Sequence, residues 1–437
     1  MARRSSNADN AESTGTSNEL ISNLIEGSEF KFIEGRVGSL SDKPKVETPI
    51  IALNDLLGGG LPLGAILEVY GPNASGKSSL MYETLGNFQR QYPNGVAFII
   101  DTETSTDDSR LRQLGVDPSR APRMGASTLE DGFEQMIKIM RKMVDDERYK
   151  GFPVFILWDT IGAAGSRSQI DSGDMYSKGM AEKARIIKSS LTAIFPLIEK
   201  LDVIVVLLNQ VMAEIGGWRP GITSSGGHAL RHDVHIRLEI NGGKTSYDGI
   251  YPVSKYSELS INKSKISPIL NKFPVQIDIT KGGVVDRNLS FIWWITNLTE
   301  PTVFSTGSWW KVSEWCYNKY RPYWDKLPKF AGKFRQSELY EVGSKDENLI
   351  DLLRLIWIDL VSDKYALQRE VVRGLRTKVE ANLMSNLGLT YDQVYHNEIV
   401  SEQAVTDNPG DTVITSDDIS SIISHLEIDE SIGEVIE

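Results

Sequence analysis

A chain of 437 residues, with 40% hydrophobic and 24% charged side chains, has the composition of a soluble globular protein with one large or two to three ordinary domains. Its single cysteine, Cys316, excludes an intrachain disulfide, and its apolar runs are too short for a bilayer-spanning helix, so we expect a soluble intracellular protein. Taken as a total, the net charge of −12 argues against a nucleic-acid partner, but the charge is unevenly distributed. Up to Lys378, 46 acidic residues balance all 47 basic residues, and the other thirteen acidic residues lie in residues 379–437.

The N-terminal region has the pattern of an unstructured start followed by a short arm. Residues 1–17 are polar and are expected to be disordered. Apolar side chains then recur at helical spacing, and Phe30 and Phe32 alternate as on a short strand. One helix and one strand within residues 18–45 are too small to bury a core. We therefore expect an oligomerisation arm that packs on the body or on a neighbouring copy.

Residues 46–290 have the pattern of an α/β core. Apolar runs with strand character lie at 65–70, 95–100, 153–158, 203–208 and 235–240. Helical stretches, for example 129–143 and 181–197, separate most of these runs, which is typical of a mostly parallel sheet buried on both faces and flanked by helices. Further strands that extend the sheet are expected at 258–265, 273–280 and 289–295.

The remaining chain is expected to form a small α+β C-terminal domain at 291–385 and an acidic, flexible tail at 386–437. Six of the nine tryptophans lie between residues 291 and 330, and a helical segment is predicted from about 345 to 385. Such a cluster is more often a core than a binding platform, although a duplex-binding role stays open. The tail either keeps the protein soluble or competes with an anionic ligand for a basic groove.

The segment GPNASGKS, which begins at Gly71, matches the phosphate-binding pattern G-x-x-x-x-G-K-[ST]. It follows an apolar strand and precedes a helix, where the backbone N–H groups of such a loop cradle phosphates. The pattern predicts that Lys77 neutralises β- and γ-phosphate oxygens and that the Ser78 hydroxyl ligates Mg²⁺. The predicted ATP contacts in this segment are Gly71, Pro72, Asn73, Ala74, Ser75, Gly76, Lys77, Ser78 and Ser79.

Two more strands end in acidic residues. Asp159 ends VFILWD and is expected to hold Mg²⁺ through water, as the carboxylate of a Walker B strand does. The segment AFIIDTETSTD supplies Asp101 and Glu103, and either carboxylate could orient or activate an attacking water. Residues two apart on a strand point the same way, so the pattern alone does not separate these two carboxylates.

The strand VIVVLL is followed by Asn209, Gln210 and a long glycine-rich loop that reaches Gly226 and Gly227 before a helix. Loops of this length in compact domains are usually functional or disordered. A glutamine at the strand end can contact the γ-phosphate while the loop after it contacts something else. The segment therefore predicts a physical link between the nucleotide and a second ligand.

Together these motifs resemble those of RecA-family homologous recombinases, in the same order, over about residues 45–285. GPNASGKSSL resembles the family's P-loop, and FIIDTETSTD with RQLGVD resembles the segment of its catalytic glutamate, which falls on Glu103. NQ resembles the family's switch glutamine, which falls on Gln210. TSSGGHALR resembles the end of its second DNA-binding loop. INKSKISP resembles paired lysines that act across the subunit interface, which fall on Lys263 and Lys265.

The resemblance implies two DNA-binding loops, at 168–179 and at 211–225. Aromatic side chains in such loops can stack on bases, and basic ones can contact phosphates. The implied DNA-binding residues are Met175, Tyr176, Lys178, Trp218, Arg219, Gly226 and Gly227.

The adenine site departs from the family pattern. The aromatic residue that the family places near the base falls on Arg110, with Asp107 three positions before it. The adenine is therefore stacked by a guanidinium or not stacked at all. The arm, the acidic tail and RQYPNGVAF are most similar to the recombinases of T4-type phages, which implies the cytoplasm of a bacterial host.

The resemblance implies a DNA-dependent ATPase that uses ATP and Mg²⁺. Such a protein forms helical filaments on single-stranded DNA, exchanges strands with homologous duplex, and has mediator and single-stranded-DNA-binding proteins as further partners. Two alternatives stay open: a ring-helicase-like motor with the same fold, and a regulatory filament protein that binds ATP but barely hydrolyses it. The presence of Lys77, Asp159 and Glu103 argues against the second alternative.

Overall fold

The computed structural model of the protein divides into two compact units, Met1–Leu383 and Met384–Glu437. Most of the expected N-terminal arm and the acidic tail after residue 395 lie outside the described residues. The described residues are 40, 42–104, 106–149, 151–172, 179–213, 222–224, 228–266, 272–279, 281–296, 302–305, 307–365 and 369–395.

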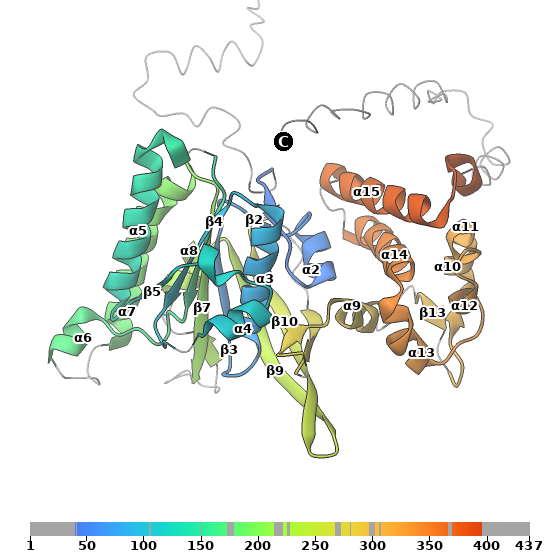
Figure 1. The fold of residues 1–437 in the computed structure, drawn as a ribbon, viewed down its shortest axis with the longest axis horizontal. Coiled ribbons are helices and arrows are strands. Elements are labelled where there is room, and N and C mark those ends of the chain that lie inside the picture. Colours follow the sequence, from blue (N-terminus) through green and yellow to red (C-terminus); the bar gives the residue numbers. More distant parts are fainter. Residues whose placement is uncertain are drawn as a thin grey trace, which may run out of the picture. The chain divides into compact units, whose positions relative to one another are not determined.

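The first unit is built on one large sheet with a parallel half and an antiparallel half (Figure 1). The strand order is β12-β11-β10-β9-β3-β7-β6-β4-β5; the strands from β9 to β5 pair in parallel, and those from β9 to β12 pair antiparallel. This confirms the expected mostly parallel α/β sheet flanked by helices. The strands are β3 (Ile66–Gly71), β4 (Val96–Asp101), β5 (Arg123–Gly125), β6 (Val154–Asp159), β7 (Val203–Ala213), β9 (Ile236–Asp248), β10 (Tyr251–Ser264), β11 (Lys272–Asp278) and β12 (Val284–Val285).

Helices cover both faces of the parallel half, as its continuous apolar strands require. Short pieces complete this part: β1 (Lys45–Val46) pairs with β2 (Leu61–Pro62), β8 (Ile222–Ser224) pairs with β7, and single 3₁₀ turns lie at Pro118–Arg120 and Glu147–Tyr149. The helices are α2 (Ile51–Leu56), α3 (Lys77–Gln91), α4 (Asp108–Gln113), α5 (Leu129–Asp145), α6 (Arg167–Ser172), α7 (Gly179–Ile198) and α8 (His228–Asp233).

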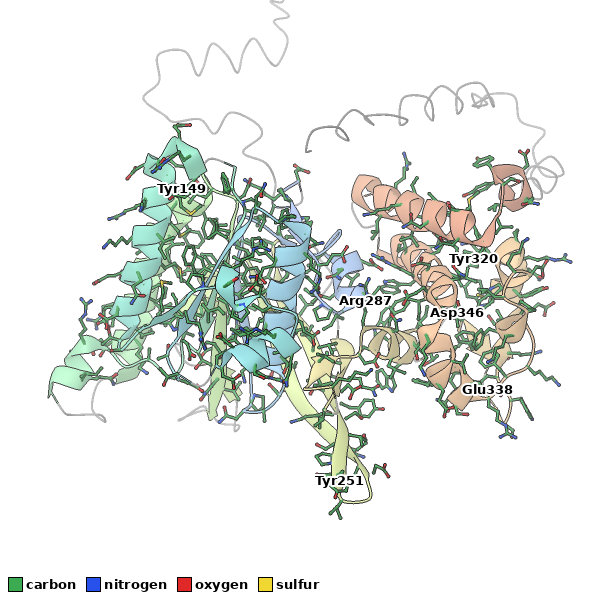
Figure 2. All side chains as sticks on the ribbon, viewed as in Figure 1. Tyr149, Tyr251, Arg287, Tyr320, Glu338 and Asp346 are labelled. Atoms are coloured by element: carbon green, nitrogen blue, oxygen red, sulfur yellow. The ribbon has the colours of Figure 1, made fainter. Side chains whose placement is uncertain are left out.

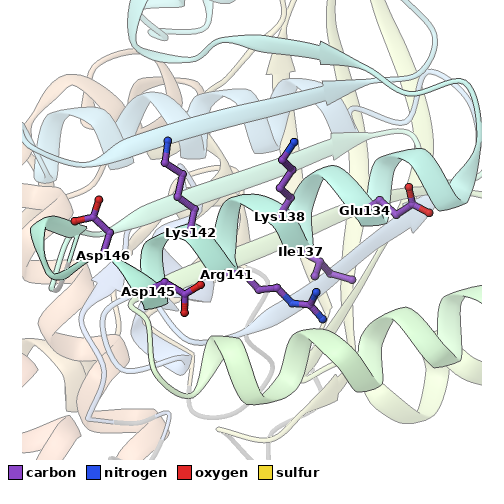
Figure 3. A pocket seen from close by; sticks show the side chains of 7 residues that line it. All are labelled: Glu134, Ile137, Lys138, Arg141, Lys142, Asp145 and Asp146. Carbon is purple, nitrogen blue, oxygen red and sulfur yellow. The ribbon is translucent and has the colours of Figure 1, made fainter.

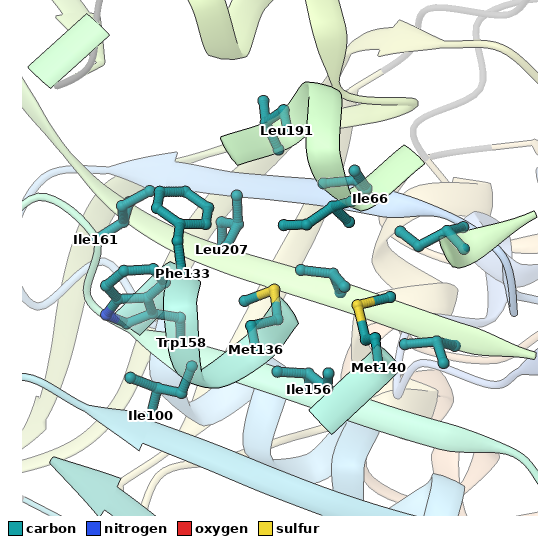
Figure 4. Packing of buried hydrophobic residues seen from close by; sticks show 14 of the residues in the cluster. Ile66, Ile100, Phe133, Met136, Met140, Ile156, Trp158, Ile161, Leu191 and Leu207 are labelled. Atoms are coloured by element: carbon teal, nitrogen blue, oxygen red, sulfur yellow. The ribbon is translucent and has the colours of Figure 1, made fainter. Parts of the chain in front are cut away.

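The strand β6 shows how alternation assigns side chains to the two faces. Trp158 is fully buried in the cluster formed with α5 and α7, where its ring meets Phe133 edge-on at 5.0 Å (Figure 4). Phe155, on the opposite face, lies 5.5 Å from the ring of Phe88 in α3. Gly132 allows α5 to approach this closely, since a Cβ there would lie 2.2 Å from the Trp158 ring.

The β9–β10 hairpin is much longer than its parallel neighbours. Only residues 236–239 of β9 pair with β3, so the rest of the hairpin continues beyond that strand. Its far end exposes Tyr247, Ile250 and Tyr251, and Tyr251 is labelled there in Figure 2. The sequence predicted the strands but not a hairpin of this length.

The prediction of a strand at 289–295 is wrong, because this segment belongs to helix α9 (Arg287–Thr296). Its β-branched and aromatic residues favour a strand, but propensity is a weak determinant when packing and capping decide otherwise. Asp286 caps the helix, since its Oδ1 accepts a hydrogen bond from Leu289 N at 2.9 Å. The apolar face then buries Phe291 and Ile295.

The described part of the chain after α9 contains two short strands, a 3₁₀ turn at Gly343–Lys345 and six helices. Arg354 of this part forms a buried ion pair with Asp55 of α2 at 2.5 Å. Trp324 is fully buried, whereas Trp309 is 52% exposed, so the tryptophan cluster is only partly a core. The domain boundaries stay a prediction. The elements are β13 (Phe304–Ser305), β14 (Lys311–Val312), α10 (Glu314–Lys319), α11 (Arg321–Trp324), α12 (Pro328–Ala331), α13 (Gln336–Glu341), α14 (Glu347–Tyr365) and α15 (Arg369–Leu387).

The expected helical segment from 345 to 385 is thus divided between α14 and α15. Within the described residues, no helix is both long and apolar enough to span a membrane.

Candidate nucleotide site

The P-loop connects β3 to α3, as the sequence predicted. Helix α3 begins at Lys77, and the Lys77 Nζ donates hydrogen bonds to the carbonyl oxygens of Gly71 at 2.9 Å and Pro72 at 2.7 Å. The lysine side chain therefore lies over the loop. Burial lowers the pKa of Lys77, and the negative charges of Asp159 and Glu103 oppose that shift.

The loop depends on glycine at its last turn. Gly76 precedes the helix with a φ of +103°, and a Cβ there would lie 2.3 Å from the Ile277 Cδ1 of β11. Asn73 and Ala74 at the centre of the loop are exposed, whereas Ser75 is fully buried. Backbone N–H groups at such a helix N-terminus favour an anion.

Parallel pairing brings the polar strand ends to one edge of the sheet. Asp101 at the end of β4 pairs in register with Asp159 at the end of β6, and Gly71 of β3 pairs with Gln210 of β7. The carboxyl edge of a parallel sheet is where ligands bind in open α/β folds. The predicted P-loop, carboxylates and glutamine therefore share one edge.

Asp159 contacts the start of α3. The Tyr82 hydroxyl donates to Asp159 Oδ2 at 3.1 Å, and the Ser78 side chain is hydrogen-bonded to the same carboxyl group. Burial raises the pKa of Asp159, these two hydrogen bonds oppose the shift, and the nearby Glu103 and Asp101 charges add to it. Tyr82 was missed by the sequence analysis, although it lies four positions after Ser78 and hence on the same helix face.

The structure separates the two candidate carboxylates. Strand β4 ends at Asp101, so the strand alternation on which the two carboxylates were expected to point the same way does not extend to Glu103. Asp101 is buried, and its Oδ2 accepts a hydrogen bond from Thr106 N at 3.2 Å. Glu103 is exposed at the edge, where its Oε1 accepts a hydrogen bond from the Thr160 hydroxyl at 3.2 Å.

Gln210 reaches the same carboxylate. Its Nε2 donates to Glu103 Oε1 at 3.1 Å, and its backbone N–H donates to Asn209 Oδ1 at 2.9 Å. Asn209 is buried and donates through Nδ2 to Glu68 Oε1 at 2.9 Å. A Cβ at Gly162 would lie 2.9 Å from Asn209 Oδ1, so a glycine keeps the two strand ends close. Glu103 is thus joined directly to the strand that leads into the long loop.

The oxygen donors at this edge fit Mg²⁺. The Ser78 side chain interacts with the Asp159 carboxyl group, and Asp101 Oδ1 is a buried oxygen that has no hydrogen-bond partner among the described residues. Hydroxyl and carboxylate oxygens are the donors that Mg²⁺ prefers, with phosphate and water supplying the rest. No cluster of three or more His, Cys, Asp or Glu side chains suited to a metal is found in the described part of the chain.

Arg110 lies beside the start of α3. Its Nη2 donates to the Ser79 hydroxyl at 2.9 Å, and a Cβ at Gly283 would lie 3.0 Å from the same nitrogen. Asp107 caps α4 by accepting a hydrogen bond from Arg110 N at 2.7 Å. The guanidinium is therefore held between the P-loop helix and the Gly283 turn.

Comparison with known proteins assigns more than half of the chain to the family that its motifs resemble. Residues 21–284 match the model of the RecA N-terminal domain. The chain belongs to the RecA family. It is 30% identical to Protein RecA of Chloroherpeton thalassium over 270 residues, covering 60% of this chain and 72% of that protein. It is 27% identical to Protein RecA of Wolinella succinogenes (64% and 77% covered) and 26% identical to that of Trichormus variabilis (72% and 86% covered).

With this membership, the observed sheet and its helices are the RecA fold. Lys263 of this RecA-family chain lies away from its own P-loop: its Nζ donates to the carbonyl oxygens of Arg231 at 3.1 Å and His232 at 2.5 Å, at the end of α8. Burial lowers the pKa of Lys263, and the Lys265 charge adds to this. Burial and both lysines lower the pKa of His235, to about 4.

The residues that the RecA resemblance assigned to DNA lie outside the described residues. This applies to Met175, Tyr176 and Lys178 of the first loop, and to Trp218, Arg219, Gly226 and Gly227 of the second. The ends of the second loop are described: Val211 of β7 pairs with Ser224 of β8, and α8 begins at His228 as expected.

A pocket of about 640 Å³ lies apart from the nucleotide site of the RecA fold. Among the described residues, it is lined by the outer face of α5 and by Asp146, as Figure 3 shows, and none of these belongs to the P-loop or to the carboxylates. Charges of both signs line it, including Lys138, Lys142 and Asp145. It shows no feature that selects a ligand.

Proposed function

We propose that this RecA-family chain is an ATP-dependent DNA strand-exchange recombinase. It forms a helical filament on single-stranded DNA and pairs that strand with homologous duplex. The observation that carries the proposal is the hydrogen bond between Gln210 Nε2 and Glu103 Oε1, 3.1 Å long. It connects a carboxylate beside the P-loop to the strand that enters the predicted second DNA-binding loop.

In this proposal the described residues divide the work of ATP hydrolysis. The P-loop amides and Lys77 hold the phosphates, and Arg110 with Asp107 lies toward the base. Ser78 and, through water, Asp159 hold Mg²⁺, which neutralises developing phosphate charge when bound. Glu103 orients or activates the attacking water, and Thr160 with Gln210 holds Glu103 in place.

Lys263 and Lys265 are proposed to act on the ATP of a neighbouring subunit. Lys263 belongs to β10 and contacts the end of α8, the helix that begins after the second loop, and Lys265 follows β10. A cation supplied from a neighbour makes hydrolysis depend on assembly, as a trans-acting arginine finger does. The arm at 18–45 is proposed to dock on that neighbour.

The DNA contacts are proposed for the two loops. Trp218 stacks on bases, and Arg219 and Lys178 contact phosphates. Base pairing supplies the sequence information, so the protein needs only backbone and stacking contacts. The arm and acidic tail favour a T4-type phage recombinase that works in the cytoplasm of a bacterial host, with mediator and single-stranded-DNA-binding proteins as partners.

The test is strand exchange between a circular single strand and a linear duplex, with ATP and Mg²⁺. We expect joint molecules with homologous duplex, none with a heterologous duplex of equal length, and ATP hydrolysis that rises with single-stranded DNA. Unwinding of a duplex without a homologous partner would instead identify a motor of the same fold. A lack of DNA stimulation would contradict both roles.

A further inference from the structure

The outer side of the P-loop is held by strand β10. Lys255 Nζ donates to the carbonyl oxygen of Ala74 at 2.5 Å, and the Ser257 hydroxyl donates to that of Ser75 at 3.0 Å. When the N–H groups of a loop converge on an anion, carbonyls elsewhere in the loop point away from it and need other partners. β10 supplies partners for two such carbonyls at the middle of the loop.

An irregularity in the hairpin lies where it crosses the P-loop. The pairing register of β9 and β10 shifts between Lys255 and Ser257, where β9 contains one residue more than β10. Such a bulge bends a strand and re-aims its side chains. It needs glycine at position 243, because a Cβ there would lie 1.7 Å from the carbonyl oxygen of Tyr256.

The conformation of the loop centre makes these bonds important. Ala74 has a φ of +56°, a left-handed value that a residue with a Cβ adopts at a cost. The Lys255 bond lies on the carbonyl of this strained residue. The Ser257 bond lies on the next one, so the two together fix the orientation of the peptide groups at the centre of the loop.

We propose that Lys255, assisted by Ser257, is a positioning residue of the nucleotide site. It holds the centre of the P-loop in its phosphate-binding conformation before the nucleotide arrives, and it adds positive charge beside the loop. Preorganised donors bind a polyanion more tightly because they need no rearrangement. This inference rests on the proposed ATP-binding role of the P-loop, and it gives the antiparallel half of the sheet a part in that role.

The experiment is equilibrium binding of a fluorescent ATP analogue with Mg²⁺ to the full chain, without DNA. We expect Lys255→Met to weaken binding about tenfold, or about 1.4 kcal/mol. Lys255→Arg keeps the charge and the donors and is expected to restore most of the affinity. Lys244→Met, an exposed lysine on the same hairpin, is the matched control and is expected to bind like wild type.

Gly243→Ala provides a second variant, because it displaces β10 without removing the lysine. It is expected to weaken analogue binding as well, with circular dichroism and thermal melting used to compare only folded protein. Wild-type affinity in Lys255→Met, or equal loss in Lys255→Met and Lys255→Arg, would overturn the role of Lys255. Failure of the wild-type chain to bind the analogue would instead contradict the proposed function of the P-loop itself.

Discussion

The parallel and antiparallel halves of the sheet use their strands differently. Strands β3, β4 and β6 have six residues each and are buried along almost their whole length, so polar side chains cluster beyond their ends. Strands β9 and β10 have 13 and 14 residues; β9 is buried near its start and becomes exposed toward the hairpin end, and β10 has both buried and exposed positions. A strand that is buried on both faces can contact a ligand only through residues at its end. A strand with an exposed face can also form contacts through side chains along its length.

The difference explains where functional groups lie. The parallel half places Asp101, Asp159 and Gln210 at one edge, because β4 and β6 end there and Gln210 of β7 pairs in register with Gly71, the last residue of β3. The antiparallel half contacts the same P-loop sideways, through Lys255 and Ser257. One half therefore supplies the groups proposed to face the nucleotide, and the other holds the loop that carries them.

A substitution in the P-loop, at the parallel edge of the sheet, should lower ATP hydrolysis most. Lys77→Ala should lower ATP hydrolysis about 10³-fold, because it removes the cation that we propose neutralises phosphate oxygens, while the fold is retained. Lys142→Ala, on the exposed face of α5, is the control and should hydrolyse ATP like wild type. A steady-state phosphate-release assay measures both. A Lys77→Ala rate within threefold of wild type would remove the P-loop from the mechanism.

The second prediction concerns the buried ion pair between β3 and β9, at the join where the two halves of the sheet meet. Glu68 of β3 is fully buried and pairs with Arg237 of β9 at 2.5 Å, and Asn209 also binds it. Glu68→Ala should lower the free energy of unfolding by about 3 kcal/mol, because it leaves the Arg237 charge buried without its carboxylate. Urea unfolding followed by circular dichroism measures this.

The control for this pair is the double variant Glu68→Met with Arg237→Met, which removes both charges and keeps apolar volume. It should be less destabilised than Glu68→Ala. A loss below about 1 kcal/mol in Glu68→Ala would show that the pair does not stabilise the join.

A smaller, pH-dependent effect is expected at a second join. Glu83 of α3 accepts a hydrogen bond from Val285 N of β12 at 2.6 Å, and burial raises the pKa of Glu83 to about 8. The folded state therefore favours the protonated form. This contribution to stability is fully present below about pH 4.5 and is lost as the pH rises through about 8.

Glu83→Gln removes that loss while keeping an amide oxygen for Val285. At pH 8.5 its free energy of unfolding should exceed that of wild type by about 1 kcal/mol, which a higher melting temperature would show. At pH 4.5 the two proteins should melt at about the same temperature. Glu341→Gln, which is exposed, should show no such pH-dependent difference. A difference between Glu83→Gln and wild type that is the same at both pH values would refute the assignment.

Much of the parallel half could be predicted from the sequence, because strands buried on both faces appear as continuous apolar runs that end at a polar residue. The runs before Gly71, Asp101, Asp159 and Asn209 are confirmed as strands, and their shared edge follows from parallel pairing. The different surroundings of Asp101 and Glu103 did not follow from the pattern, because they depend on where β4 ends.

The antiparallel half was harder to predict. The aromatic residues near Trp294 indicated a strand, while the Asp286 cap and burial of one face make a helix. The contact of Lys255 with Ala74 joins positions 181 residues apart and depends on a bulge at Gly243, which no local pattern specifies. Contacts between side chains along a strand and residues far away in the sequence are not indicated by any spacing pattern in the sequence.

We propose that Gln210 couples Glu103 to the predicted second DNA-binding loop. The most direct test is ATP hydrolysis by wild type and by Gln210→Ala, each with and without single-stranded DNA, with nucleotide affinity measured alongside. We expect DNA to stimulate the wild-type rate, and we expect Gln210→Ala to bind nucleotide normally but to hydrolyse it at one rate with or without DNA. The same DNA stimulation in Gln210→Ala as in wild type would contradict the proposed coupling.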